Sequence, residues 1–168
     1  MSEVDTVIED RKITYEGMFS TAEVYKMIEG YFSKLGYDRV ELKNSEVVRA
    51  EGKYIEIILE PYKTVSDYAR YVVNIKMIFS DVKDAEAKID GKKKRMNLGK
   101  VQILFNGYLV TDYENRWEQK PIYYFVRAMM NKYILMPVTG KYKAEIKTHV
   151  EQCSLNIKSF LNLARYQQ

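Results

Sequence analysis

The chain has 168 residues, of which 46% are hydrophobic and 30% are charged, and these values are typical of a folded globular domain. A domain of this length buries about 70% of the surface that its unfolded chain exposes, so we expect a single domain, 1–168, with its own core. Its only cysteine, Cys153, and its only histidine, His149, exclude an internal disulfide and a zinc site built from cysteine and histidine. We therefore predict no metal and no cofactor.

The N-terminal segment 1–11 is polar and lacks periodicity, which predicts a flexible tail. It has neither the basic start nor the apolar run of a secretory signal. The most apolar segment, 121–137, contains Arg127 and Lys132, so we predict no transmembrane segment. Together these features predict a cytoplasmic protein.

The first half of the chain predicts a strand, a helix and further strands. Alternating residues indicate a strand at 12–19, and Ser20 or Thr21 then offers an N-cap for a helix that Gly36 closes. Apolar residues inside that helix recur at spacings of three and four. The segment 38–50 predicts a short strand and a loop, and 54–60 predicts another strand, ended by a proline.

The centre of the chain predicts an unusually long β-hairpin. Apolar and polar residues alternate from Arg70, and Asp90-Gly91 supplies the dipeptide that favours a type I′ turn. The return strand runs to Asp112, which gives about 20 residues for each arm. Gly107, inside the return strand, indicates a bulge or a place where another element packs closely.

The C-terminal third predicts two helices. The first begins near Pro121 and carries a broad apolar stripe as far as Ile134. Pro137 ends it, and 138–140 forms a link to a final helix. The final helix has apolar residues at almost ideal helical spacing: Ile146, Val150, Cys153, Ile157, Phe160, Leu161 and Ala164.

These elements together predict an α+β fold in which a curved antiparallel sheet with a long central hairpin packs against a C-terminal helix, with further helices added. Over 12–166, the order of the elements resembles the helix-grip fold of the START and Bet v 1-like superfamily. That resemblance implies a sheet wrapped around the last helix, with a cavity between them. The segments 107–118 and 160–166 also look like those of archaeal proteins without a known activity, so this second likeness implies no activity.

Tyrosine, which accounts for 15 residues, suggests a site for an apolar ligand, because its ring is apolar and its hydroxyl is polar. We predict a non-enzymatic binding protein with an apolar, tyrosine-edged cavity or groove for a hydrophobic small molecule or a lipid-like ligand. The candidate lining residues come from the helix after Pro121 and from one strand: Tyr123, Phe125, Met129, Met130, Tyr133 and Phe105. The same helix offers two alternatives, a plain core face or a surface for a protein partner or a second copy.

A run of basic residues lies at the tip of the predicted hairpin. The candidate phosphate-binding residues are Lys92, Lys93, Lys94 and Arg95. They would act as a clamp on nucleic acid, on a ribonucleoprotein or on an anionic surface. The alternative is a solubilising turn that protects a strand edge.

Catalytic signals are weak, and we predict no catalytic residues. His149 and Cys153 are one helical turn apart, but we interpret them as a boundary histidine and a core cysteine rather than a catalytic dyad. A cluster after the long hairpin offers carboxylates for a cation or for acid–base chemistry, but a structural role beside the next helix explains it better. That cluster consists of Asp112, Glu114, Arg116, Trp117 and Glu118.

Overall fold

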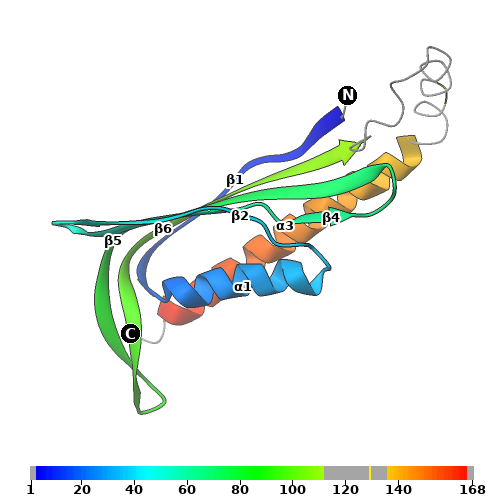
Figure 1. Ribbon diagram of the computed structural model, residues 1–168. Helices are drawn as coiled ribbons and strands as arrows, with labels where there is room; N and C mark the ends of the chain where they lie inside the picture. Colours follow the sequence, from blue (N-terminus) through cyan, green and yellow to red (C-terminus); the bar gives the residue numbers. More distant parts are fainter. Residues whose placement is uncertain (1–2, 112–128, 130–135, 166–168) are drawn as a thin grey trace.

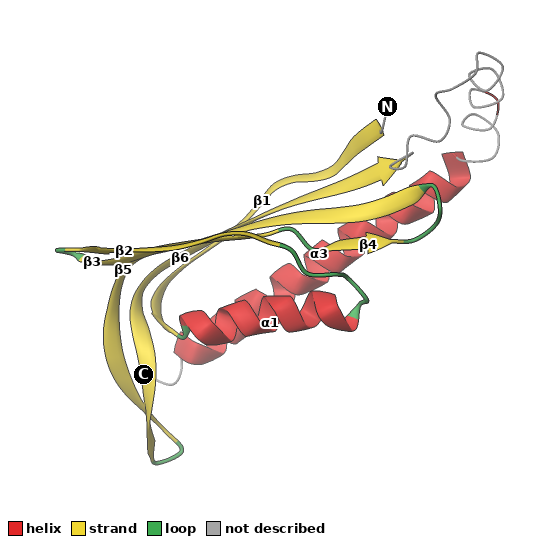
Figure 2. Cartoon of the chain, in the orientation of Figure 1, coloured by secondary structure: helices red, strands yellow, loops and turns green. Residues whose placement is uncertain are grey.

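The structure is a computed structural model that describes residues 3–111, 129 and 136–165. One curved antiparallel sheet carries two helices on a single face (Figures 1 and 2). This arrangement confirms the predicted α+β class. The elements, in chain order, are β1 (Glu3–Phe19), α1 (Thr21–Lys34), β2 (Glu41–Arg49), β3 (Gly52–Leu59), β4 (Tyr62–Thr64), β5 (Ala69–Ile89), β6 (Lys92–Thr111) and α3 (Met136–Arg165).

The sheet has the strand order β1-β6-β5-β3-β2, and the short β4 pairs with β5 beyond the end of β3. At its centre, β5 and β6 form the predicted long hairpin, with 21 and 20 residues. Asp90 and Gly91 have φ angles of 49° and 75° at the turn. Two consecutive positive φ angles define a type I′ turn, so the Asp90-Gly91 prediction is confirmed.

The core lies between the sheet and the two helices. Along β5 alternate residues are buried, from Ala69 to Phe79, and they face the buried side of α3. The buried residues of α3 follow the predicted stripe: Ile146, Val150, Cys153, Ile157 and Leu161. Gly107 lies beneath this helix, where an added Cβ would be 3.1 Å from Ile146 Cγ2, which confirms the predicted close packing.

The helix α1 begins and ends as predicted. The Ser20 side chain accepts a hydrogen bond from the Glu23 amide at 3.3 Å, and Gly36 follows the helix with a φ of 80°. The buried residues Val24, Ile28 and Phe32 attach α1 to the core beside α3. Along the first half of α1, a space remains between this helix and the sheet.

A bend in β5 divides the long hairpin into a core part and a distal part. The pairing of β5 with β6 shifts between Ser80 and Lys83, and Asp81 has a φ of 55°. Glycines on the two neighbouring strands, Gly52 and Gly99, lie against this bend. The distal part, residues 82–98, consequently turns out of the plane of the sheet and passes the N-terminus of α1 (Figure 1).

Two predicted segment boundaries were wrong. Residues 3–11, expected as a tail, form the first half of β1 and pair with β6 from Glu3 onward. They lie at the sheet edge with mostly exposed side chains, so they need no apolar alternation. Residues 138–140, expected as a link, belong to α3, because Pro137 fits the first turn of a helix as well as the end of one. Apart from residue 129, the helix predicted after Pro121 lies outside the described residues.

Candidate functional site

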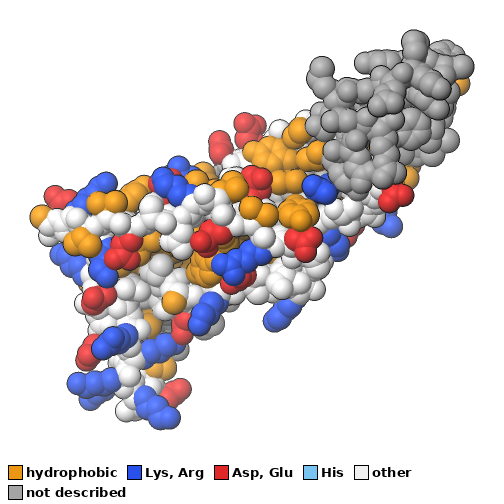
Figure 3. Space-filling model, viewed as in Figure 1, with side chains coloured by type: hydrophobic (Ala, Val, Ile, Leu, Met, Phe, Trp, Pro, Cys, Tyr) orange, Lys and Arg blue, Asp and Glu red, His pale blue; other side chains and the backbone are white. Residues whose placement is uncertain are grey.

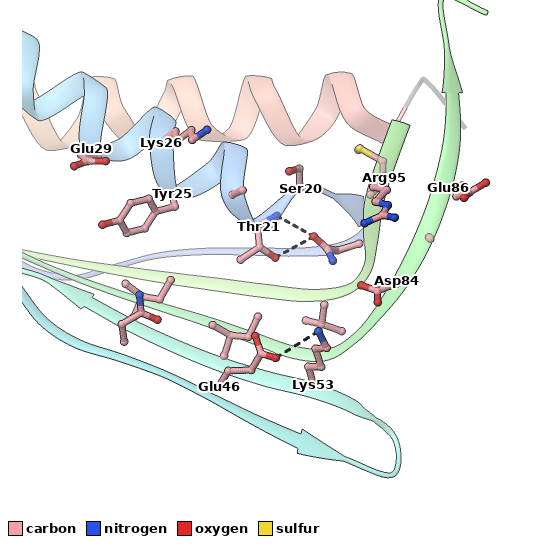
Figure 4. A pocket seen from close by; sticks show the side chains of 18 residues that line it. Ser20, Thr21, Tyr25, Lys26, Glu29, Glu46, Lys53, Asp84, Glu86 and Arg95 are labelled. Carbon is pink, nitrogen blue, oxygen red and sulfur yellow. Dashed lines mark hydrogen bonds and ion pairs between the residues drawn. The ribbon is translucent and has the colours of Figure 1, made fainter. Parts of the chain in front are cut away.

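A groove of about 1010 Å³ lies between α1 and the sheet. The first half of α1, the β2–β3 hairpin and the base of the distal hairpin form its walls (Figure 4). The third wall exists because β5 bends at Asp81 and carries the distal hairpin toward α1. Three segments that are distant in the sequence therefore enclose one concave surface.

The groove is amphipathic. Five of its apolar residues come from the strands and are at least half buried, so they form the floor: Ile55, Ile57, Val82, Ala85 and Met96. Charged residues of both signs surround them: Lys26, Glu29, Glu46, Lys53, Asp84, Glu86 and Arg95. Such a surface suits a ligand that has an apolar body and polar or charged groups.

Hydrogen bonds fix the first turn of α1 to the distal hairpin. Asn97 Oδ1 accepts hydrogen bonds from the Thr21 amide at 3.1 Å and from Thr21 Oγ1 at 3.2 Å (Figure 4). Lys94 adds an ion pair with Glu23 in the same turn. Across the groove, Lys53 Nζ lies 3.4 Å from Glu46 Oε1 and joins β3 to β2. These contacts hold the walls in place without filling the space between them.

Four polar side chains, which we call the Arg39 cluster, lie at one end of the groove, where two of them, Tyr25 and Glu29, line it. Tyr25 donates a hydrogen bond to Glu41 Oε2 at 2.7 Å, Arg39 Nη2 donates to the Tyr25 hydroxyl at 2.6 Å, and Arg39 pairs with Glu29. Burial, followed by the hydrogen bond to Glu41, raises the pKa of Tyr25 to about 12. The phenol therefore stays protonated and remains a donor near neutral pH.

A smaller pocket of about 180 Å³ lies beyond the Arg39 cluster. Glu29 lines both spaces, while Tyr25 lines the groove and Arg39 lines the inner pocket. The inner pocket has apolar walls from α1 and from the strands and the segment that follows β3: Ile28, Phe32, Leu59, Pro61 and Ile75. Polar residues line it as well: Glu29, Ser33, Asp38 and Arg39. The Arg39 cluster thus lies between a wide groove and a small pocket, both of mixed polarity.

A tyrosine–histidine network lies deeper, between α1, β5 and α3. The Tyr37 hydroxyl is 3.0 Å from His149 Nδ1, and the Tyr71 hydroxyl donates to Glu145 Oε2 at 2.9 Å. Burial raises the pKa of both tyrosines, so both hydroxyls stay protonated. Burial favours the neutral imidazole of His149, and in its Nε2-protonated tautomer Nδ1 accepts a hydrogen bond from Tyr37.

We expect the stability of the protein to fall in mild acid because of His149. Burial lowers the pKa of His149, outweighing the opposing charge of Glu145, and Lys63 lowers it further. The unfolded state then binds the extra proton first, so the stability present above about pH 6.5 is lost as the pH falls through the folded-state pKa. Urea unfolding at about pH 7.5 and about pH 5 should show a larger loss for the wild type than for His149→Asn, which keeps an acceptor but does not titrate. Equal losses would contradict this role.

The predicted cavity residues do not line this groove in the described part of the chain. Phe105 is fully buried in the core, and Met129 is 49% exposed. The other four, Tyr123, Phe125, Met130 and Tyr133, lie outside the described residues. The same holds for Asp112, Glu114, Arg116, Trp117 and Glu118.

The predicted phosphate-binding residues begin β6 in the distal hairpin, where charged side chains of both signs mix (Figure 3). Lys94 pairs with Glu23, and Lys93 Nζ lies 3.7 Å from Glu86 Oε2. Arg95 lines the groove. Lys92 lies at the exposed tip, so the four residues share a hairpin but have different neighbours.

Cys153 is part of the core, as predicted. Its side chain is buried, and burial raises the pKa of its thiol to about 12, which keeps it a thiol rather than a reactive thiolate. The His149 ring is directed to Tyr37 instead. This geometry agrees with the core interpretation of Cys153 and with a boundary position for His149.

Sequence reasoning missed the groove and the Arg39 cluster. Arg39 and Glu41 fall in the segment 38–50, where the sequence predicted only a short strand and a loop. Tyr25 and Glu29 are half buried and lie beside the buried stripe of α1, where polar residues are ordinary. The only sequence signal for the cluster was the mixed polarity of that helix face, and this did not indicate which other residues would contact it.

The chain matches no family model, and no curated protein and no solved structure is similar to it. In the part of the chain that the structure describes, no helix has both the length and the hydropathy needed to cross a membrane.

Proposed function

We propose that this chain is a non-enzymatic binding protein that holds an amphipathic small molecule, with a hydrophobic or lipid-like body, in the groove between α1 and the sheet. The observation that carries the proposal is the groove itself, about 1010 Å³ in volume with an apolar floor and a charged edge. Ligand pockets in proteins commonly measure about 300 to 1,000 Å³. The helix-grip resemblance implies a cavity beneath the last helix, whereas this groove lies beneath α1 and has no lining residue from α3, so the proposal rests on the groove alone.

The ligand's apolar body would lie on Ile55, Val82 and Met96, and its polar groups would face Lys26, Arg95 or their acidic neighbours. Burial of apolar surface contributes about 25 cal/mol per Å² before the costs of association. Basic and acidic side chains are both present, so the groove does not demand a strongly charged ligand. A neutral or zwitterionic polar group fits this mixed edge best.

The first test is native mass spectrometry of protein purified from its own cells. A mass excess of a few hundred daltons that disappears on denaturation would support the proposal and reveal the chemical class of the ligand. Copurified nucleic acid instead would favour the basic distal hairpin as the functional surface. If the native mass equals that of the chain alone, the probe-binding experiment below decides.

We expect Ala22→Trp to weaken binding of the uncharged fluorescent probe Nile red by at least about tenfold. Ala22 is exposed on α1 and lines the groove, so the indole would occupy the ligand's space without disturbing the core. Ala144→Trp is the matched control, because Ala144 is exposed on α3 and does not line the groove. Fluorescence titration measures both variants, and equal effects, or no binding by the wild type, would refute the proposal.

A further inference from the structure

The strand β2 forms one edge of the sheet, and among the described elements it pairs only with β3. Its outer side therefore offers backbone N–H and C=O groups to another strand. Edge strands of this length are usually protected by proline, by bulges or by charges directed along the edge. The other edge, β1, has such protection, because its pairing with β6 shifts twice near Ile8 and Asp10 has a φ of 47°.

The protection of β2 is weak over most of its length. It contains no proline, and its pairing with β3 is regular from Lys43 to Arg49. Lys43 is paired with Glu56, and Glu46 with Lys53, so both charges are directed to β3 rather than outward. Val48 is 74% exposed and Leu42 is 55% exposed. Figure 3 shows apolar side chains among charged ones at this end of the sheet.

The hairpin turn determines which residues of β2 have unused backbone groups. Arg49 pairs with Gly52 across the two-residue turn at 50–51, so these two residues exchange both backbone hydrogen bonds. Hydrogen-bonded and non-hydrogen-bonded pairs alternate along antiparallel strands. Asn44, Glu46 and Val48 consequently direct their N–H and C=O groups to the outside.

We propose that β2 pairs antiparallel with β2 of a second copy of this chain, around a two-fold axis at Ser45. In this register Asn44 hydrogen-bonds through its backbone to the partner's Glu46, and Val48 lies near the irregular end of the partner's β2, which contains Leu42. The stem of Lys43 lies opposite the partner's Val47, which is also exposed. Each pair occurs twice, and none places like charges opposite each other, so the strand is complementary to itself.

The neighbouring registers are less favourable. An axis at Glu46 would place the two copies of Glu46 directly opposite each other, and like charges in that position are destabilising. An axis at Asn44 would place the partner's Glu46 against the register shift between Glu41 and Lys43, where the strand is irregular. The axis at Ser45 is therefore the register that the side chains of β2 select.

The dimer would align the two candidate grooves on the same face of one continuous sheet, because the two-fold axis runs perpendicular to it. Asn44 and Glu46 line the groove and also lie at the proposed interface. The dimer does not depend on the identity of the ligand, so it is testable without one.

Sedimentation equilibrium tests the interface. We expect the wild type to be a dimer, and Asn44→Glu, which places a glutamate opposite the partner's Glu46 twice, to raise the dissociation constant by at least about tenfold. Combining Asn44→Glu with Glu46→Lys creates opposite charges in the same two pairs and should restore the dimer. This rescue is expected only with the axis at Ser45, because only that register places residue 44 of one copy opposite residue 46 of the other.

Asn156→Glu is the matched control, because Asn156 is exposed on α3, and it should leave the dissociation constant unchanged. Circular dichroism and the melting temperature show whether each variant is folded. A wild type that stays monomeric at about 0.1 mM would overturn the proposal. A dimer that Asn44→Glu leaves intact would also overturn it, as would a double variant that fails to associate.

Discussion

Replacing Gly52 with alanine is expected to lower the free energy of unfolding by about 3 kcal/mol. Gly52 has a φ of 144°, which side chains rarely adopt, and an added Cβ would lie 2.7 Å from the Asp81 carbonyl carbon. The obstructing atom belongs to the backbone, so no side-chain rotation relieves the contact. The strands must move apart at the bend, and the cost combines backbone strain with overpacking.

Substitutions at two other glycines separate the cost of backbone strain from the cost of overpacking. Gly91→Ala meets a positive φ of 75° but nothing within 4 Å, so it should cost about 1 kcal/mol. Gly30→Ala, inside α1 and also in open space, should stabilise the protein by about 0.5 to 1 kcal/mol. Urea unfolding of the three variants gives the comparison. A Gly52→Ala variant that loses no more stability than Gly91→Ala would contradict the close packing of Gly52 against the bend.

The bend shapes the candidate groove, because it positions the distal hairpin that forms one of the groove's walls. Gly99 contributes from the other neighbouring strand, where an added Cβ would lie 2.8 Å from the Ser80 carbonyl oxygen. Asp81, with its positive φ, lies between the two glycines. A sheet that remained straight here would carry the distal hairpin away from α1 and leave the groove open on that side.

Local signals predicted the ends of elements well. The Ser20 cap, Gly36 and the Asp90-Gly91 turn each depend on a few adjacent residues, whose backbone preferences act over one turn. Burial patterns succeeded where one face is fully covered, as in β5 and α3. The fold class followed from the order of these elements.

Strands at the sheet edges were harder to predict. The first half of β1 and the whole of β2 expose most of their side chains, so no apolar alternation marks them. Their structure depends on backbone pairing, with the distant β6 for β1 and with the adjacent β3 for β2. An edge strand is stabilised mainly by backbone pairing with its neighbouring strand, so its own side-chain pattern does not predict it.

The candidate site followed even less from the sequence. The groove is assembled from α1, the β2–β3 hairpin and the distal hairpin, and the Arg39 cluster joins a helix to a loop and an edge strand. No short motif encodes such contacts between distant segments. The tyrosine content suggested a tyrosine-edged site for an apolar ligand, but among the tyrosines of the described residues only Tyr25 lines the groove.

Replacing Phe105 with alanine is expected to lower the free energy of unfolding by about 3 to 5 kcal/mol. Phe105 is fully buried, opposite Ile75 on β5, and its removal leaves a cavity that surrounding strands and α3 cannot easily close. Leu104→Ala is the control: Leu104 is adjacent in β6 but lies on the other, half-buried face, so it should lose less than half as much.

This pair of variants also distinguishes a core from a ligand cavity at Phe105. A phenylalanine that lined an empty cavity would already lack contacts on one side, and its truncation would cost little stability while changing the space for a ligand. In a filled core the same truncation removes packing on every side. Urea unfolding of Phe105→Ala, with probe titration of the same variant, should therefore show a large loss of stability and an unchanged affinity at the groove. A small loss with altered probe affinity would return Phe105 to the ligand site that the sequence predicted.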